Sequence, residues 1–263
     1  MPRSQGFAVR AFGCTLAFST SCPAARQALD QWIFPSLPRS DSSSDAPDVS
    51  IHIENAAGEF ALHVDGSRAA VAVGEDTLGL NLIRVVDEAL ISRISTLWAV
   101  HAGAVAWRGR ALLLPGITHS GKSSLVIELL RQGASYLSDE YALIDSEGLI
   151  HGYPRPVLVR TGQAQQIPVL PETFGTVAAN TPLPMGWIMA LQYSSEADWK
   201  LTALSQSEGL MALLQNTPHA LAEMPQITGI FGRAVGRARC YAGYRNHATE
   251  AAIEILRFID RMN

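Results

Sequence analysis

The sequence has little charge: Asp, Glu, Lys and Arg make up only 17% of its 263 residues, whereas hydrophobic residues make up 48%. A chain of this length and composition can bury a large core, so we expect one large or two modest folded domains. The formal net charge of -4 gives no overall attraction for nucleic acid or anionic lipid. We therefore expect no nucleic acid and no membrane among its partners.

Cysteines and long hydrophobic runs are also scarce. The cysteines, Cys14, Cys22 and Cys240, are odd in number and lack the paired short spacing of a zinc site. This disfavours both a disulfide framework and a structural metal site. No run approaches the roughly 18 apolar residues that are needed to cross a bilayer. These features are typical of a cytoplasmic protein.

The first part of the chain is rich in predicted strands. Strand-like patterns lie at 7–18, 49–53, 60–64 and 68–73. Asp65-Gly66, between the last two, is typical of a hairpin turn. Over 77–96 apolar residues recur at helical spacing, with Asp87 on another face. We therefore expect a β-rich amino-terminal region, 1–76, and a second region, 77–263, that opens with a connecting helix.

The second region mixes predicted strands and helices, which indicates a mixed α/β fold. Strands are predicted at 100–107, 110–114, 134–138, 141–144, 149–153 and 187–192, and helices at 122–132, 208–215 and 249–262. Gly133 suits the left-handed cap that ends the first of these helices, because glycine lacks a Cβ. The stretch from Pro154 to Pro184 is predicted as a Pro-rich loop.

A phosphate-binding motif lies between the strand at 110–114 and the helix at 122–132. The pattern G-x-x-x-x-G-K-[ST] is satisfied by Gly116, Ile117, Thr118, His119, Ser120, Gly121, Lys122 and Ser123. Such a loop curls so that its amides point at phosphate oxygens, and the dipole of the following helix favours anions. Lys122 is expected to bind the β- and γ-phosphates and Ser123 to bind Mg²⁺, with Ser124 in a position to assist.

Two acidic residues follow the next predicted strand. Asp139 and Glu140 come directly after Ser138, and Asp139 lies 17 residues after Lys122, which leaves room for one helix, a turn and a strand. Carboxylates at that position can face both Mg²⁺ and the γ-phosphate. We therefore predict Ser123, Asp139 and Glu140 as metal ligands, and ATP with Mg²⁺ as the bound cofactors.

Taken together, these segments resemble the HPr kinase/phosphorylase group, whose nucleotide-binding core is similar to that of phosphoenolpyruvate carboxykinase. The matching segments are His101-Ala102-Gly103-Ala104-Val105, the phosphate loop, Gly133-Ala134 and Ser138-Asp139-Glu140-Tyr141. The resemblance implies a phosphate-loop core of this type. It also implies that His101 lies near the transferred phosphate, that Asp139 is the catalytic base and that Glu140 assists with Mg²⁺.

This sequence also departs from the family pattern. The family usually has Asp where Glu140 stands, and its later Glu-x-Arg-Gly segment has no clear counterpart here. HPr itself is therefore not the acceptor that we expect. Some related proteins phosphorylate a serine of a ribosomally made precursor peptide, such as a lasso-peptide precursor. The resemblance thus implies a kinase that acts on a serine of a peptide or protein.

Arg155 is a further candidate for the catalytic site. It lies between two prolines on a loop shortly after the acidic pair, where a guanidinium could stabilise charge on the transferred phosphoryl group. The alternative is an ordinary surface arginine. We interpret the run of Arg233, Arg237 and Arg239 as solvated charge.

Two other functions fit the same residues. One is a kinase of a small alcohol such as free serine, because the sequence does not define the acceptor pocket. The other is a nucleotide-binding sensor without chemistry, which the presence of both His101 and Asp139 argues against. A homo-oligomer is compatible with all of these.

Overall fold

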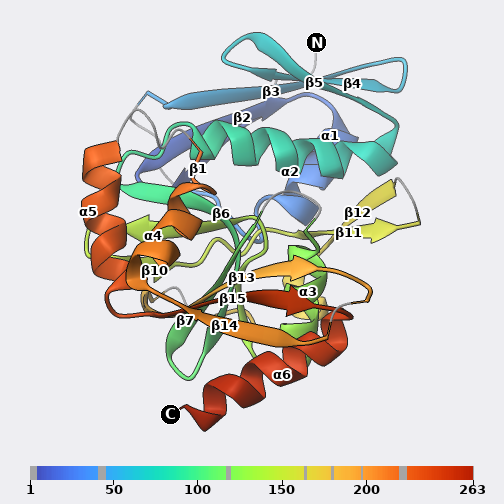
Figure 1. Ribbon diagram of the computed structural model, residues 1–263. Coiled ribbons are helices and arrows are strands. Elements are labelled where there is room, and N and C mark those ends of the chain that lie inside the picture. Colours follow the sequence, from blue (N-terminus) through green and yellow to red (C-terminus); the bar gives the residue numbers. More distant parts are fainter. Residues whose placement is uncertain are drawn as a thin grey trace. The chain divides into compact units, whose positions relative to one another are not determined.

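The chain folds into two compact units. The computed structural model describes residues 5–40, 46–116, 120–162, 165–178, 181–196, 198–218 and 224–262. The amino-terminal unit comprises Met1–Thr96 and Arg155–Leu170, and the carboxy-terminal unit comprises Leu97–Pro154 and Pro171–Asn263 (Figure 1). The predicted boundary between residues 76 and 77 differs from this division.

The amino-terminal unit is built on a five-stranded sheet. Its strands follow the order β1 (Gln5–Ala11), β2 (Cys14–Thr20), β3 (Val49–Ala56), β4 (Glu59–Val64) and β5 (Ser67–Val73). The sequence predicted one strand over 7–18, but Phe12 and Gly13 both adopt positive φ and turn the chain into a hairpin. The hairpin predicted at Asp65-Gly66 is confirmed, since both residues have positive φ between β4 and β5.

Two helices pack in this unit. The parallel strands β2 and β3 are joined through α1 (Pro23–Trp32), which the sequence analysis missed, and β5 is followed by α2 (Glu75–Ile91). The helices contact each other, and Gly79 allows the close approach because a Cβ there would lie 2.7 Å from the Trp32 ring. Since α2 also contacts β4 and β5, it belongs with the first region and not with the second.

The face of α2 that carries Asp87 is buried. The sequence analysis had placed Asp87 on a different face from the apolar residues of this helix. Asp87 is 6% exposed and lies 2.9 Å from the Nε of Arg155, which is 2% exposed. Beyond Arg155 the chain forms the hairpin of β11 (Val157–Thr161) and β12 (Gln165–Val169), where a loop was predicted. The return of the chain to this unit thus gives the buried carboxylate of Asp87 a cationic partner.

The carboxy-terminal unit contains an eight-stranded mixed sheet. Its strands are β6 (Leu97–Trp107), β7 (Arg110–Pro115), β8 (Ser135–Ser138), β9 (Tyr141–Asp145), β10 (Leu149–His151), β13 (Leu183–Tyr193), β14 (Lys200–Leu204) and β15 (Arg239–Arg245). Along the sheet the order is β10-β9-β6-β7-β13-β15-β14, and β8 also pairs with β6. Strands β7, β13 and β15 are parallel, so their carboxyl ends meet at one edge.

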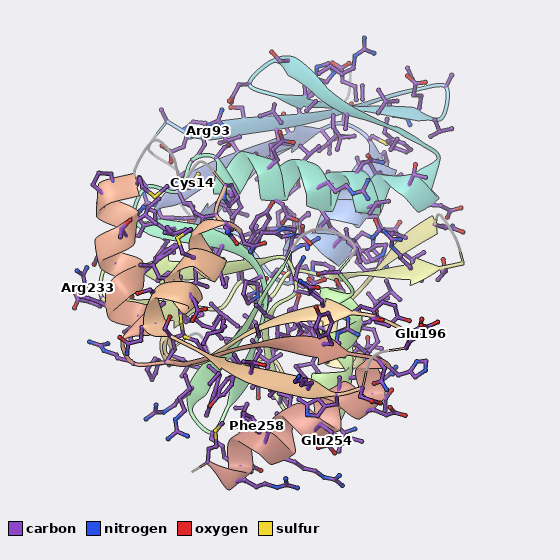
Figure 2. The ribbon with its side chains drawn as sticks, in the orientation of Figure 1. Cys14, Arg93, Glu196, Arg233, Glu254 and Phe258 are labelled. Carbon is purple, nitrogen blue, oxygen red and sulfur yellow. The ribbon has the colours of Figure 1, made fainter. Side chains whose placement is uncertain are left out.

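Helices cover both faces of this sheet (Figure 1). The helices are α3 (Lys122–Arg131), α4 (Gln206–Leu214), α5 (Met224–Val235) and α6 (Ala248–Arg261), and a short 3-10 helix spans Pro171–Thr173. Cys240 of β15 packs in the core formed with α4 and α5. The ring of the next residue, Tyr241, meets that of Phe258 edge-on, with 5.0 Å between the centroids, and Figure 2 shows Phe258 on α6. Because adjacent strand residues face opposite sides, α6 and its neighbour α3 lie on the other face.

The mixed α/β class predicted from the sequence is confirmed by these elements. The predicted helices at 122–132, 208–215 and 249–262 correspond to α3, α4 and α6, and Gly133 has the left-handed φ expected of it. The sequence analysis missed α5, β14 and β15. Among the described residues, no helix is both long enough and apolar enough to span a membrane.

Candidate functional site

Strand β6 brings the predicted site segments together. On one side it pairs with β7, where Ala102 lies opposite Pro115 at the start of the phosphate loop. On its other side it pairs with β9, where His101 lies opposite Tyr141, and with β8, where Ala104 lies opposite Ser138. The Asp-Glu pair between those two strands therefore reaches the same end of β6 as the loop does.

The phosphate loop leads directly into α3, as predicted. Gly121 precedes the helix with φ 79° and ψ 23°, a left-handed conformation that glycine adopts without strain. The ammonium of Lys122 donates to the carbonyl of Gly116 at 2.7 Å, which closes the two ends of the motif on each other. Ile117, Thr118 and His119 lie outside the described residues, so their part in nucleotide binding stays a prediction.

Lys122 lies in a partly buried setting near two carboxylates. Burial lowers the pKa of its ammonium, and the charges of Glu140 and Asp139 oppose that shift. A desolvated lysine interacts more strongly with an anion than a solvated one, because less water screens the charge. Lys122 is thus suited to bind phosphate oxygens.

Asp139 is the most deeply buried of the predicted site residues that the structure describes, with 1% of its surface exposed. Its Oδ2 accepts a hydrogen bond from the hydroxyl of Ser123 at 2.8 Å, and its Oδ1 accepts one from the hydroxyl of Tyr136 at 2.9 Å. Asp139 therefore links the end of β8 to the first turn of α3. The sequence analysis did not identify Tyr136, because a tyrosine within an apolar strand gives no sign that its hydroxyl will donate to the carboxylate of Asp139.

The contact between Ser123 and Asp139 fits a Mg²⁺ site of the nucleotide type. Within the described part of the chain, no three His, Cys, Asp or Glu side chains are grouped to hold a metal. Mg²⁺ in such sites needs only one or two protein oxygens, because phosphate oxygens and water complete its shell. A serine hydroxyl and a carboxylate 2.8 Å apart are suitable oxygens.

Glu140 pairs with His101. The Nε2 of His101 lies 3.0 Å from the Oε1 of Glu140, and both side chains are partly exposed. The backbone reinforces this contact, because the amide of Ala102 donates to the carbonyl of Glu140 at 3.1 Å. The structure therefore brings together His101 and Glu140, as well as Ser123 and Asp139.

Arg245 contacts the phosphate loop, and the sequence analysis did not identify it. It ends β15, is 3% exposed, and its Nη2 donates to the carbonyls of Ser120 and Gly121 at 3.1 and 2.9 Å. Burial lowers the pKa of its guanidinium, and Tyr193 opposes that shift. The signal that could have found it is an arginine at the carboxyl end of a parallel strand, but β15 itself was not predicted.

The two remaining candidates lie elsewhere. Ser124 is exposed on the first turn of α3, with no described contact to the acidic pair. Arg155 belongs to the amino-terminal unit, where its guanidinium faces Asp87. It is not the surface arginine that we considered as the alternative, and its predicted catalytic role stays a prediction.

Comparisons with known proteins give little further information. No known family matches the sequence, and no curated protein matches it. Among solved structures, the chain is similar to the HPr(Ser) kinase/phosphatase from Coxiella burnetii, with 16% identity over 64% of this chain and 97% of that one. The TM-score of 0.32 is too low to support an inference about activity. The function must therefore be judged from the site itself.

Proposed function

We propose that this protein is an ATP- and Mg²⁺-dependent phosphotransferase that transfers the γ-phosphoryl group to a serine hydroxyl of a peptide or protein. The observation that carries the proposal is the 2.8 Å hydrogen bond between Ser123 and Asp139. It joins the residue that ends the phosphate motif to a buried carboxylate that directly follows β8. Phosphoryl transfer requires these two groups close together, because one positions the nucleotide and the other faces its reacting end.

The chain's own residues would divide the work as follows. Lys122 and the loop amides bind the β- and γ-phosphates, and Asp139 accepts the proton of the attacking hydroxyl. A new bond forms between the serine oxygen and the γ-phosphorus, while the bond from that phosphorus to the β,γ-bridging oxygen breaks and ADP leaves. Bound Mg²⁺, held by Ser123 and Asp139, would supply neutralising charge for the phosphates.

His101 and Glu140 would lie beside the transferred group. The 3.0 Å contact between them fixes the imidazole, so the ring is held for a hydrogen bond to the phosphoryl oxygen or to the acceptor. The assignment follows the resemblance noted from the sequence. This arrangement does not need Arg155, the candidate on the loop after Tyr153.

The peptide nature of the acceptor is the finer part of the proposal. A peptide substrate would use binding energy from residues remote from the serine to align the hydroxyl for in-line attack. A free-serine kinase would gain nothing from such residues. An ATP sensor would bind the nucleotide and transfer nothing.

The test is transfer of radiolabelled γ-phosphate from ATP to a serine-terminated peptide, to shortened versions of it and to free serine. Lys122→Met serves as the inactive control. We expect transfer to the full peptide that falls steeply with truncation. Equal transfer to free serine would replace the peptide by a small alcohol, and ATP binding without any transfer would favour the sensor.

A further inference from the structure

Arg245 reaches the phosphate loop from the far end of the carboxy-terminal unit's sequence, 125 residues after Ser120. Its guanidinium contacts three backbone oxygens: Nη2 contacts the carbonyls of Ser120 and Gly121, and Nη1 contacts that of Asn246 at 3.1 Å. An arginine that is 3% exposed and bound to carbonyls holds a position, since those contacts order the groups that accept them.

These contacts determine where the loop amides point. The carbonyl and the amide of one peptide group point in opposite directions, because the group is planar and trans. Fixing the carbonyl of Ser120 therefore fixes the amide of Gly121, and fixing the carbonyl of Gly121 fixes the amide of Lys122. The Gly121 carbonyl also accepts from Leu125 at 3.2 Å, as the first bond of α3. The Lys122 amide consequently points beyond the helix start, where anions bind.

The arginine is itself held in place. Its guanidinium lies over the ring of Tyr193 at 5.3 Å from the centroid, and Tyr193 and Arg245 are paired residues of the parallel strands β13 and β15. Gly121 also packs closely against the guanidinium, because a Cβ at that position would collide with it. The loop, the arginine and the tyrosine thus fit in one arrangement, which leaves little freedom for the Ser120-Gly121 peptide to rotate.

We propose that Arg245 is a positioning residue that holds the Ser120-Gly121 peptide in the phosphate-binding orientation before the nucleotide arrives. The proposal rests on the proposed function, because it assigns a purpose to the loop amides. Arg245 acts through the backbone of the loop and does not touch the transferred group. Its removal should therefore weaken the capture of ATP more than the transfer step, since bound phosphates can orient the amides themselves.

The first test compares Arg245→Met with the wild type in steady-state kinetics and in ATP titrations. We expect the KM and Kd for ATP to rise about 10- to 100-fold, while kcat at saturating ATP stays within about threefold. Arg239→Met is the matched control, because Arg239 lies on the same strand, is exposed and contacts Met262 instead of the loop. An unchanged KM in Arg245→Met, or a fall in kcat with KM unchanged, would overturn the proposal.

Hydrogen exchange of the nucleotide-free protein separates this proposal from the proposed function. Amides over 120–125 should exchange faster in Arg245→Met than in the wild type and in Arg239→Met, with or without any ATP activity. If the wild type binds no ATP but the exchange difference appears, the proposed function fails and the positioning role stands. Equal exchange in all three proteins would refute the positioning role.

Two milder variants cover the case in which Arg245→Met does not fold. Arg245→Lys keeps the charge but loses the fork that bridges two carbonyls, so its KM for ATP should lie between those of the wild type and Arg245→Met. Tyr193→Leu changes an exposed ring and should raise the KM for ATP about two- to fivefold. Wild-type KM values in both variants would also overturn the proposal.

Discussion

Among the described residues, each unit buries one aspartate almost completely, and the two aspartates are held differently. Asp87 of the amino-terminal unit faces the guanidinium of Arg155 at 2.9 Å. Asp139 of the carboxy-terminal unit accepts hydrogen bonds from the neutral hydroxyls of Ser123 and Tyr136, with Lys122 near enough for the charges to interact. The first carboxylate is neutralised at close range, and the second is oriented by hydroxyl groups, one of which belongs to the last residue of the phosphate motif.

This difference indicates the role of each buried aspartate. A guanidinium and a carboxylate in direct contact within one unit satisfy each other, so we expect that pair to maintain the fold. A carboxylate held by hydroxyls keeps its direction, which suits contact with a cation or a reacting hydroxyl. Substitutions at the two places should therefore affect different properties.

The largest expected effect on stability comes from Arg155→Met. Removing the guanidinium leaves Asp87 buried without its ion-pair partner, which should lower the free energy of unfolding by about 3–5 kcal/mol. Urea denaturation measures this. The double variant Asp87→Leu/Arg155→Met should regain much of the loss, because neither charge then remains. A folded Arg155→Met of normal stability that had lost phosphoryl transfer would instead support the catalytic prediction for Arg155.

Lys122→Met should have the opposite effect to Arg155→Met: it should weaken ATP binding without lowering the free energy of unfolding. Loss of the ammonium should weaken ATP binding by about 30-fold or more, as when one partner of a charge pair is removed. The pKa of Lys122 is lowered in the folded state, so the unfolded chain holds this proton more tightly. Carrying the charged ammonium of Lys122 therefore destabilises the folded state relative to the unfolded chain. The free energy of unfolding at pH 7 should therefore stay the same or rise.

The pH dependence checks the sign of that argument. In the wild type, stability should increase as pH rises from the lowered pKa of Lys122 towards the ordinary lysine value of about 10.4. Lys122→Met should lack this increase. Calorimetric ATP titration together with urea denaturation at pH 7 and pH 10 measures both properties. A variant that lost stability as well as ATP binding would contradict the division between the two sites.

Tyr136→Phe should have a smaller effect that is confined to the carboxy-terminal site. The variant keeps the buried ring but removes one hydroxyl donor from Asp139. A hydrogen bond to a charged group is worth about 1.5–3 kcal/mol, so phosphoryl transfer should fall roughly tenfold or more. Single-turnover measurements with pre-bound ATP check this. Transfer at the wild-type rate would show that the orientation of Asp139 does not depend on the tyrosine.

The smallest effect is expected at Asp145, an aspartate in a hairpin of the carboxy-terminal unit. Burial would raise its pKa, but hydrogen bonds from His151 and from the amides of Leu149 and Glu147 lower it overall. The stability it supplies is present above the unfolded pKa of about 3.9 and is lost as pH falls through the lower folded value. Asp145→Asn should therefore flatten the stability profile below about pH 4. An identical acid profile in both proteins would remove this assignment.

Local pattern indicated which residues lie together at the centre of the candidate site. The loop, the helix over 122–132 and the acidic pair lie within a short segment, so spacing alone indicated that Lys122, Ser123 and Asp139 belong together. The strand pairing of β6 then produced the predicted neighbourhood with His101. Each of these inferences depends on a residue whose type indicates a particular chemical role.

The rest of the site and of the fold depends on contacts between residues that are distant in sequence, and the sequence analysis did not find these contacts. Arg245 meets the loop only because β15 pairs in parallel with β13, and the sequence around β15 gave no strand prediction. The sequence analysis placed Asp87 on a face away from the apolar residues of its helix, because its partner, Arg155, is distant in sequence and lay in a predicted loop. A single sequence shows the type of a residue but not which distant residue will neutralise it.

The most direct measurement of the central claim is phosphoryl transfer from radiolabelled ATP by Asp139→Asn, with the Kd for ATP measured in the same preparation. Asp198→Asn, at an exposed position, is the matched control. We predict a Kd for ATP within a few-fold of the wild type and a transfer rate lower by about a hundredfold or more, because the variant keeps the shape of Asp139 but cannot accept the proton. Transfer at the wild-type rate by Asp139→Asn would contradict the account.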